Sequence, residues 1–193
     1  MAARIISKVF PVVVTEEELE PGDHVYTYRR YGVYTHHGIY IGEGTVIHFT
    51  RTGVDATCLD CFRREGEKLH SLRSYAYGRS LLRFMFTKRG TCTTLPDTRL
   101  PQEVVNTARE LHERGGFGEY DLLNNNCEHF ATFCRTGVRE STQTAWISSC
   151  ERKIEKAKAW ALKLLRELSS SDPKIRGELS MGIESKSSIA EQA

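Results

Sequence analysis

Alternation of apolar and polar residues predicts β-structure in the N-terminal part of the chain. A turn signal at residues 20–23 introduces three predicted strands, which cover residues 24–28, 34–41 and 45–50. The last two are separated by the loop 42–44, and a loop of three residues is common in β-hairpins when a glycine adopts positive φ. The pattern therefore predicts a small antiparallel sheet near the start of the chain.

Helical spacing replaces this alternation further along the chain. Residues 102–114 carry apolar side chains at helical intervals, with Pro101 before them and two glycines after them. A long helix is predicted over residues 145–168, where lysines and arginines occupy the faces that the apolar positions leave. From residue 51 to residue 99 the pattern is weaker, and residues 81–86 fit either a further strand or a buried helical turn.

The most informative helix is predicted to begin at Cys127. Three asparagines precede it at residues 124–126, and asparagine is a preferred helix cap because its side chain accepts from the free N–H groups of the first turn. The apolar stripe consists of Cys127, Phe130, Ala131 and Cys134. The polar side consists of Glu128, Thr132 and Arg135, and Gly137 ends the helix. We therefore expect the thiol of Cys127 to face inward, toward the sheet.

Composition and charge narrow the class of protein. The chain has 193 residues, enough for one domain with its own core plus extensions, and its net charge of +2 is too small to predict a nucleic-acid partner. No segment reaches the ~20 apolar residues that span a bilayer, and the apolar run 9–14 is too short for a signal peptide. We expect a cytoplasmic protein that binds no nucleic acid; its protein partners cannot be identified from the sequence.

Six cysteines raise the question of disulfides: Cys58, Cys61, Cys92, Cys127, Cys134 and Cys150. Because a secretion signal is missing and the domain is large enough to fold without cross-links, we predict reduced thiols. Cys58 and Cys61 form a CxxC motif without the second pair that a zinc site would need. We interpret it as a structural or surface loop with two thiols, with a redox dithiol or a metal site as alternatives.

His36 and His48 are predicted to share one face of the hairpin. With the loop 42–44, paired residue numbers sum to 86, so Gly38 lies opposite His48. His36 is then a diagonal neighbour of His48, with about 7 Å or less between their Cβ atoms. His37 points to the other face. We expect the face that carries His36 to meet the apolar stripe of the cysteine helix.

A thiol and two histidines in this arrangement predict nucleophilic catalysis. Cys127 in the first helical turn lies at the positive end of the helix dipole, which favours the thiolate that attacks carbonyl carbon. His36 is the candidate base, His48 would orient and polarise it, and the backbone N–H of Cys127 is a candidate oxyanion donor. Taken alone, each residue fits a buried structural role better than a catalytic one. Their combination favours a Cys/His acyl-transfer enzyme.

The other histidines are interpreted as structural. His129 lies two residues from Cys127 and points elsewhere, so it is assigned to the surface or to helix support. His24, His70 and His112 show no pattern of partners.

Three spaced motifs resemble those of the lecithin:retinol acyltransferase (LRAT-like) family. They are HHGIYIG at residues 36–42, VIHF at residues 46–49 and NNCEHF at residues 125–130. The opening PGDHVY at residues 21–26 is also similar, and the resemblance covers residues 19–137. The family's two histidines, twelve residues apart, fall on His36 and His48, and its cysteine falls on Cys127.

The resemblance implies an α+β, permuted papain-like (NlpC-type) fold, in which a small antiparallel sheet packs on the helix that carries the cysteine. It also implies thioester chemistry. Cys127 would take a fatty acyl group from a glycerophospholipid and pass it to water, as in phospholipase A1/A2 activity, or to an acceptor. No metal or organic cofactor is implied. Tyr120, which matches a tyrosine of vertebrate members, and Asn126 are the expected supporting residues, and the segment around Cys58 and Cys61 resembles plant members.

The predicted organisation has four parts. They are an N-terminal extension (1–18), the LRAT-like catalytic domain (19–137), a basic amphipathic helix (138–168) and a disordered tail (169–193). Several animal members end instead in a hydrophobic anchoring helix. The basic amphipathic helix suits either peripheral attachment to an anionic membrane surface or packing on the domain itself.

Two other functions stay open at this point. One is a cysteine peptidase of the permuted papain-like type, such as an NlpC-type or deubiquitinating enzyme with a similar cysteine motif. The other is a membrane-associated scaffold that keeps the fold without turnover. The spacing of His36 and His48 within a hairpin favours the lipid enzyme.

Overall fold

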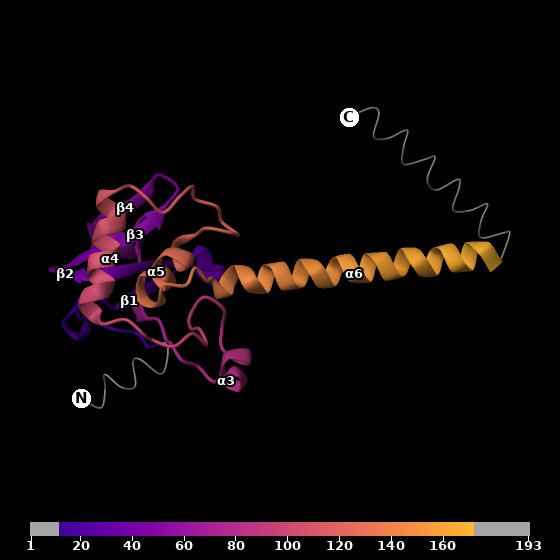
Figure 1. Ribbon diagram of the computed structural model, residues 1–193, viewed down its shortest axis with the longest axis horizontal. Helices are drawn as coiled ribbons and strands as arrows, with labels where there is room; N and C mark the ends of the chain where they lie inside the picture. Colours follow the sequence, from indigo (N-terminus) through magenta and orange to yellow (C-terminus); the bar gives the residue numbers. More distant parts are fainter. Residues whose placement is uncertain (1–11, 172–193) are drawn as a thin grey trace. The chain divides into compact units, whose positions relative to one another are not determined.

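The computed structural model describes residues 12–171 of the chain. The strands are β1 (His24–Arg29), β2 (Tyr34–Gly42), β3 (Thr45–Thr50), β4 (Gly53–Cys58), β5 (Arg64–Glu65), β6 (Lys68–Leu69) and β7 (Arg73–Ser74). The helices are α2 (Leu59–Arg63), α3 (Leu81–Met85), α4 (Pro101–Glu113), α5 (Cys127–Thr136) and α6 (Thr142–Ser171), with the short 3-10 helices η1 (Glu16–Glu18) and η2 (Arg30–Gly32). The expected α+β class is confirmed (Figure 1).

An antiparallel sheet of five strands is the centre of the fold. Its strand order is β4-β3-β2-β1-β7, so the strands that carry His36 and His48 are neighbours. The predicted register is confirmed where Gly38 pairs with His48. The smaller sheet contains only β5 and β6.

The predicted three-residue loop of the β2–β3 hairpin is wrong by one residue. Gly42, rather than Ile41, pairs with Thr45, because a bulge after residue 40 shifts the register. The turn therefore consists of two residues, Glu43 and Gly44. Both adopt positive φ, at 50° and 64° respectively. The bulge at residue 41 changes the turn but does not change the pairing of Gly38 with His48.

Helices α4 and α5 cover one face of the sheet (Figure 1). The buried cluster on this face joins Ile39, Ile47 and Phe49 of the strands to Val104 and Ala108 of α4 and Phe130 and Ala131 of α5. The expectation that the face of His36 meets the helix stripe is therefore wrong, because alternation along β2 puts His37, with Ile39, on the α5 side. Parity identifies which residues share a face, but it does not identify which face a helix will cover.

Helix α2 covers the opposite face, the one that carries His36. Phe62 of α2 packs in a second buried cluster with Tyr40 and Val46. Its ring approaches Gly38 so closely that a Cβ atom at this position would contact both Phe62 and Val46. The glycine of the HHGIYIG motif thus permits α2 to approach the sheet. The weak pattern between residues 51 and 99 gave no sign of β4 or α2.

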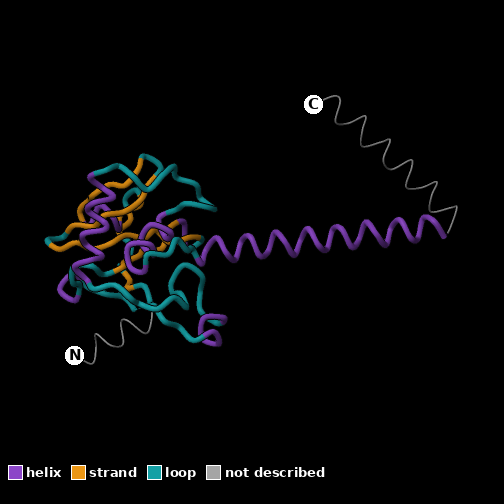
Figure 2. Tube along the Cα trace, in the orientation of Figure 1, coloured by secondary structure: helices purple, strands orange, loops and turns teal. Residues whose placement is uncertain are grey.

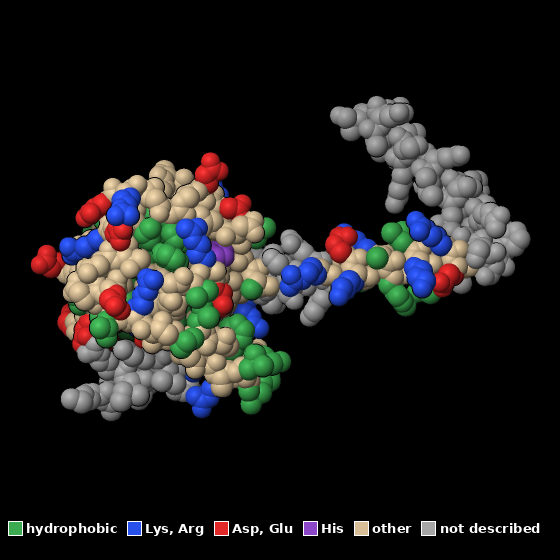
Figure 3. All heavy atoms as spheres, in the orientation of Figure 1, with side chains coloured by type: hydrophobic (Ala, Val, Ile, Leu, Met, Phe, Trp, Pro, Cys, Tyr) green, Lys and Arg blue, Asp and Glu red, His purple; other side chains and the backbone are tan. Residues whose placement is uncertain are grey.

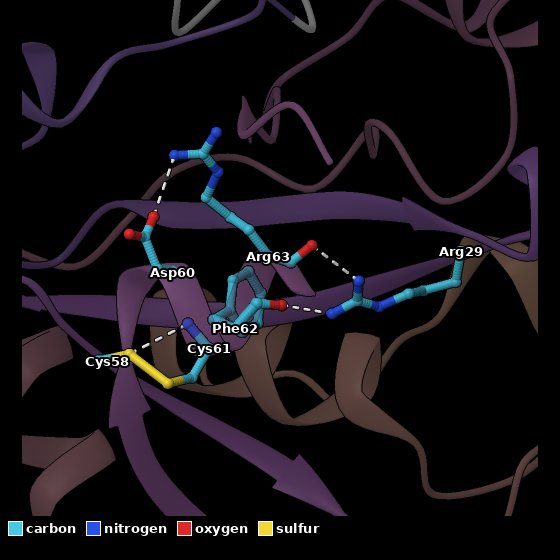
Figure 4. Close-up of a disulfide and its surroundings, with 6 residues drawn as sticks. All are labelled: Arg29, Cys58, Asp60, Cys61, Phe62 and Arg63. Carbon is cyan, nitrogen blue, oxygen red and sulfur yellow. Dashed lines mark hydrogen bonds and ion pairs between the residues drawn. A yellow bond between two sulfur atoms is a disulfide. The ribbon is translucent and has the colours of Figure 1, made fainter. Parts of the chain in front are cut away.

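Cys58 and Cys61 form a disulfide (Figure 4). Cys58 ends β4 and caps α2, which brings its Cα atom to 5.1 Å from that of Cys61, a separation that suits a disulfide. The prediction of reduced thiols is therefore wrong for this pair, because local helix geometry places the two sulfur atoms together. Cys92, Cys127 and Cys134 are free and buried.

Residues 81–86 form neither a strand nor a buried turn. They include α3, in which no residue is buried, although most of its side chains are apolar. Loops connect α3 to its neighbours on both sides (Figure 2). The apolar run predicts burial, and that prediction is wrong for these residues.

The chain divides into two compact units, and the boundary along the sequence falls between Trp146 and Ile147. The described part of the second unit belongs to α6, whose Trp160 and Leu162 side chains are exposed. None of the helices in residues 12–171 combines the length and apolarity needed to cross a membrane. The predicted domain boundaries stay predictions, and most of the expected tail and N-terminal extension lie outside the described residues.

Candidate active site

The predicted asparagine cap of α5 is observed. The side-chain oxygen of Asn126 accepts from the backbone N–H groups of Glu128 at 2.9 Å and His129 at 3.2 Å. In return, the backbone N–H of Asn126 donates to Nδ1 of His129 at 3.1 Å. His129 therefore supports the helix start as one alternative predicted, but it is buried rather than on the surface. This reciprocal cap fixes the backbone around Cys127.

The sulfur of Cys127 lies beside the backbone of β2, immediately next to His36. Its Sγ atom is 3.9 Å from the carbonyl oxygen of Thr35, and the backbone N–H of His37 donates to it. Pairing of β2 with β3 begins only at Gly38, so the sulfur lies along the strand edge just before that point. Although the body of α5 covers the other face, its first residue thus reaches the residue that carries the candidate base.

His36 and His48 form a hydrogen-bonded pair. Nε2 of His36 is 2.7 Å from Nδ1 of His48, as their predicted shared face requires. One nitrogen must donate and the other accept. If Nε2 of His36 carries the proton, then its Nδ1 is free to accept one from a nucleophile.

Arg29, Tyr34 and Tyr120 surround the sulfur and the histidines. After burial, the charge of Arg29 contributes to lowering the pKa values of both His36 and His48. Burial lowers the pKa of Arg29 itself, and Cys127 is among the groups that act in the opposite direction. The pKa of Tyr120 is raised, first by burial and then by the charge of Cys127, with which the phenol also forms a hydrogen bond. Tyr120 therefore lies beside the Cys127 sulfur, and its supporting role at the site stays a prediction.

Burial, rather than the helix dipole, dominates the ionisation of Cys127. Desolvation raises the pKa of its thiol to about 12, although the backbone N–H groups of His37, Cys127 and Glu128 act in the opposite direction. The expectation of a resting thiolate is therefore wrong. The helix terminus stabilises the anion too little to compensate for the loss of water.

Both imidazoles of the pair are neutral at pH 7. Burial lowers the pKa of His36 well below its usual value, with further contributions from His48 and Arg29. Burial also lowers the pKa of His48 to about 4, against the opposing charge of Asp55. The thiol of Cys127 and the two imidazoles are therefore all uncharged at pH 7.

Asp55 and Arg29 were not anticipated as part of the site. Asp55 pairs directly with His48 across β3 and β4. Thr27 of β1 pairs with His36, and Arg29 lies two residues further along the same strand, at its end. Extending the alternating pattern to β4 would have indicated Asp55, whereas no signal in the sequence indicates which arginine folds back over the site.

The sequence analysis also missed the structural role of Glu128, which it assigned to the polar side of α5. It is completely buried, and Thr132 and Arg135 are buried as well, so the helix has no solvent-facing polar side at these positions. The carboxylate accepts from the hydroxyl groups of Tyr75 (2.8 Å), Ser141 (2.6 Å) and Thr142 (2.8 Å), and from the backbone N–H of Gln143 (3.1 Å). Periodicity cannot distinguish a solvated charge from one that meets donors elsewhere in the chain.

His24, for which the sequence shows no pattern of partners, belongs to a second buried histidine pair. Its Nε2 atom is 2.9 Å from Nδ1 of His37, and its Nδ1 atom is 2.7 Å from the hydroxyl of Tyr77. A hollow of about 300 Å³ lies beside His24 and Tyr77 but is not lined by Cys127. Within residues 12–171, no group of three or more metal-ligating side chains is arranged around a possible ion.

The sequence model of the family described as "Lecithin retinol acyltransferase" matches residues 17–140 of this chain. The chain belongs to this family. Its LRAT membership, together with the sheet packed on α5, confirms the expected papain-like fold.

Curated relatives include plant and animal proteins. Protein LEAD-SENSITIVE 1 of Arabidopsis thaliana is 32% identical over 65% of this chain and 60% of its own length. Lecithin retinol acyltransferase of Mus musculus is 30% identical, and that of Homo sapiens 28% identical, each over 57% of this chain and 52% of its own length. The match thus spans less than two thirds of the length of each relative.

The buried carboxylate of Glu128 yields a stability prediction. Glu128→Gln should lower the free energy of unfolding by about 3 kcal/mol, because an amide removes the charge and turns an N–H₂ group toward groups that donate. Urea denaturation at pH 7 measures the change. Glu110→Gln, at an exposed i,i+4 pair with Arg114, is the control and should change it by less than about 0.5 kcal/mol. Equal effects of the two substitutions would contradict a structural role for the buried carboxylate.

The raised pKa of Cys127 predicts a distinctive pH dependence of alkylation. Since its thiol pKa is about 12, the thiolate fraction should rise about tenfold per pH unit between pH 7 and pH 10. Iodoacetamide labelling of Cys127, followed by peptide mass spectrometry, should follow this slope without a plateau. Cys127→Ser supplies the background from other cysteines. A plateau near pH 7 would instead indicate a resting thiolate.

Proposed function

We propose that this chain transfers a fatty acyl group from a glycerophospholipid, through a thioester on Cys127, to water or to an acceptor alcohol, amine or lysolipid. One observation carries the proposal. In a member of the LRAT family, the Cys127 sulfur lies against the backbone on both sides of His36, whose imidazole is bonded to His48. The sulfur of Cys127 therefore lies against the backbone of the residues that flank the candidate base, His36.

The first half-reaction begins from neutral partners. Nδ1 of His36 takes the proton of the Cys127 thiol while the sulfur attacks the ester carbonyl carbon. His36 keeps its Nε2 proton, which donates to Nδ1 of His48. The C–O bond of the lipid then breaks, the leaving oxygen takes the proton from His36, and a lysophospholipid departs.

The second half-reaction repeats these steps with a new nucleophile. Water or an acceptor gives its proton to His36 and attacks the thioester, and the sulfur leaves and recovers the proton. The backbone N–H groups of Cys127 and Glu128, which already contact the sulfur, are the nearest candidates for stabilising the oxyanion. The phenol of Tyr120 is a candidate third donor.

We further propose that α3 places the site at a membrane surface. Leu81, Leu82, Met85 and Phe86 are exposed, with 84% of the Phe86 surface accessible, and hydrophobic side chains gather over α3 in the space-filling view (Figure 3). Isolated apolar residues are ordinary on a surface, whereas a contiguous group suggests a binding face.

The connection between α3 and the site supports this orientation. Lys88, just after α3, donates to the carbonyl of Gly32 at 2.6 Å. Gly32 belongs to η2, which leads into β2 and so to His36. Tyr31 and Val33 on either side of it are exposed at 93% and 80%. A bilayer that took up the exposed side chains of α3 together with those of Tyr31 and Val33 would lie next to β2, the strand that contacts Cys127.

The acyl-enzyme itself is the decisive test. After incubation with phosphatidylcholine vesicles, intact-mass analysis should show a hydroxylamine-sensitive gain of one fatty acyl group, mapped to Cys127. Cys127→Ala should abolish the gain, and His36→Ala should slow its formation about 10²- to 10⁴-fold, as loss of a general base does.

Two substitutions serve as controls for this test. Cys134→Ala changes a thiol on the same helix, and His70→Ala changes an imidazole outside the site; both should retain the acyl gain. Lipid turnover by Cys127→Ala equal to that of the wild type would contradict the proposal. Faster cleavage of a peptide or ubiquitin-like substrate would favour a peptidase, and vesicle binding without any adduct would favour a scaffold.

Vesicle co-sedimentation tests the membrane face. Leu82→Asp with Phe86→Asp should weaken binding to anionic vesicles by about tenfold or more, because two large apolar side chains no longer leave water. Leu69→Asp, at another exposed leucine, should have little effect. If Leu162→Glu in α6 abolished binding while the α3 variant bound normally, the basic helix rather than α3 would be the membrane face.

A further inference from the structure

The Cys58–Cys61 disulfide takes no part in the proposed acyl transfer, and both of its residues are exposed. The free cysteines Cys92, Cys127 and Cys134 are all buried. Thiol–disulfide exchange requires an attacking thiolate to reach a sulfur atom. Among these five cysteines, only Cys58 and Cys61 are therefore accessible to a reductant in solution.

The residue that follows Cys61 rests on the histidine pair. The ring of Phe62 stacks on that of His36, with centroids 5.1 Å apart and planes inclined by 30°. It meets the ring of His48 edge-on, at 5.7 Å and 80°. Phe62 is itself buried, so a displacement of α2 would change the packing of both imidazoles.

Arg29 connects the other end of α2 to the site. Its guanidinium group donates to the backbone carbonyls of Phe62 and Arg63, the latter at 3.0 Å (Figure 4). Arg29 also contributes its charge to the environment of His36 and His48. The disulfide at the start of α2 and Arg29 at its end thus hold one short segment over the two rings.

Helix α2 needs such anchors because it has only five residues. Helices of this length are unstable alone, since nucleation is not offset by enough hydrogen bonds. The disulfide restricts the segment from Cys58 to Cys61 in a way that two separate thiols would not.

We propose that Cys58 and Cys61 form a redox-active site that undergoes exchange with a dithiol reductant, and that the disulfide form holds Phe62 in place against His36 and His48. Reduction then loosens α2 and alters the packing of the two imidazoles. The exchange and this structural effect do not depend on the acyl chemistry.

The hydrogen bond from the Cys61 N–H to the Cys58 sulfur, at 3.0 Å, sets the order of the exchange. A thiolate of the reductant attacks Sγ of Cys61, the S–S bond breaks, and Cys58 leaves as a thiolate that this bond stabilises. The mixed disulfide joins one sulfur of the reductant to Sγ of Cys61. The second thiolate of the reductant then attacks the reductant sulfur in this bond and releases Cys61 as a thiolate. Two protons pass to the cysteines, and the dithiol becomes a cyclic disulfide.

Redox titration of the full chain tests the exchange. The protein is equilibrated in buffers of reduced and oxidised dithiothreitol, alkylated and analysed by peptide mass spectrometry. Cys58 and Cys61 should become alkylated together, as a two-electron transition, while the buried cysteines do not change with the buffer. Alkylation of both residues in every buffer, or of neither in the most reducing one, would overturn the proposal.

Hydrogen exchange and NMR test the coupling to the histidines. On reduction, protection of the Arg64 amide, which donates to the carbonyl of Cys61, should fall about tenfold. The ring resonances of His36 and His48 should shift, whereas those of His112 should not. The double variant Cys58→Ser with Cys61→Ser is the matched control and should give the reduced-state values with or without dithiothreitol.

An unchanged Arg64 amide and unchanged histidine resonances on complete reduction would reject the coupling. A response of the double serine variant to dithiothreitol would likewise reject it, since the effect would then come from other cysteines. None of these measurements uses a lipid substrate. Failure of the acyl-enzyme test would therefore leave this proposal standing, and the reverse also holds.

Discussion

The buried carboxylate of Glu128 is the constraint on which the site depends. A charge removed from water is tolerable only when donors replace the water, and these donors come from Tyr75 and from the segment that opens α6. Gln143 in that segment also accepts from the N–H of Thr35 at 2.8 Å and donates to its carbonyl at 3.2 Å. The same network thus fixes Thr35 of β2, whose carbonyl oxygen lies next to the sulfur of Cys127. Cys127 directly precedes Glu128 in the chain. Satisfying one charge in the core therefore sets the position of the sulfur against the strand.

Burial also determines the chemistry that this position permits. The first turn of α5 offers N–H groups that favour an anion, but the sulfur is too far removed from water for them to prevail. The same desolvation keeps the imidazoles of His36 and His48 uncharged. Charge would then develop only during attack, when a carbonyl substrate is present. Burial separates the Cys127 sulfur from adventitious oxidants, while the oxidised CxxC pair lies exposed on the same chain.

Local patterns predicted the parts of the fold that local physics controls. The pairing of Gly38 with His48 follows from strict alternation, and the Asn126 cap follows from the free N–H groups of a helix start. The side of the sheet that α5 covers, the donors around Glu128 and the bulge at the hairpin turn all depend on contacts between distant segments. A single sequence carries no direct signal for such contacts. The disulfide differs, because the missing secretion signal predicts reduced thiols, whereas the geometry of a short helix brings Cys58 and Cys61 together.

Helix α5 is enclosed on nearly every side, and its buried residues include Cys127 and the residues after it up to Thr132. Such a helix cannot move toward a lipid without breaking the core. For the acyl transfer proposed above, access would then require displacement of the surrounding surface segments, among them the one that carries Tyr120. The rate of turnover would then depend on how often those surface segments open. Because such opening moves the chain through solvent, the rate would vary with solvent viscosity as well as with the chemical step.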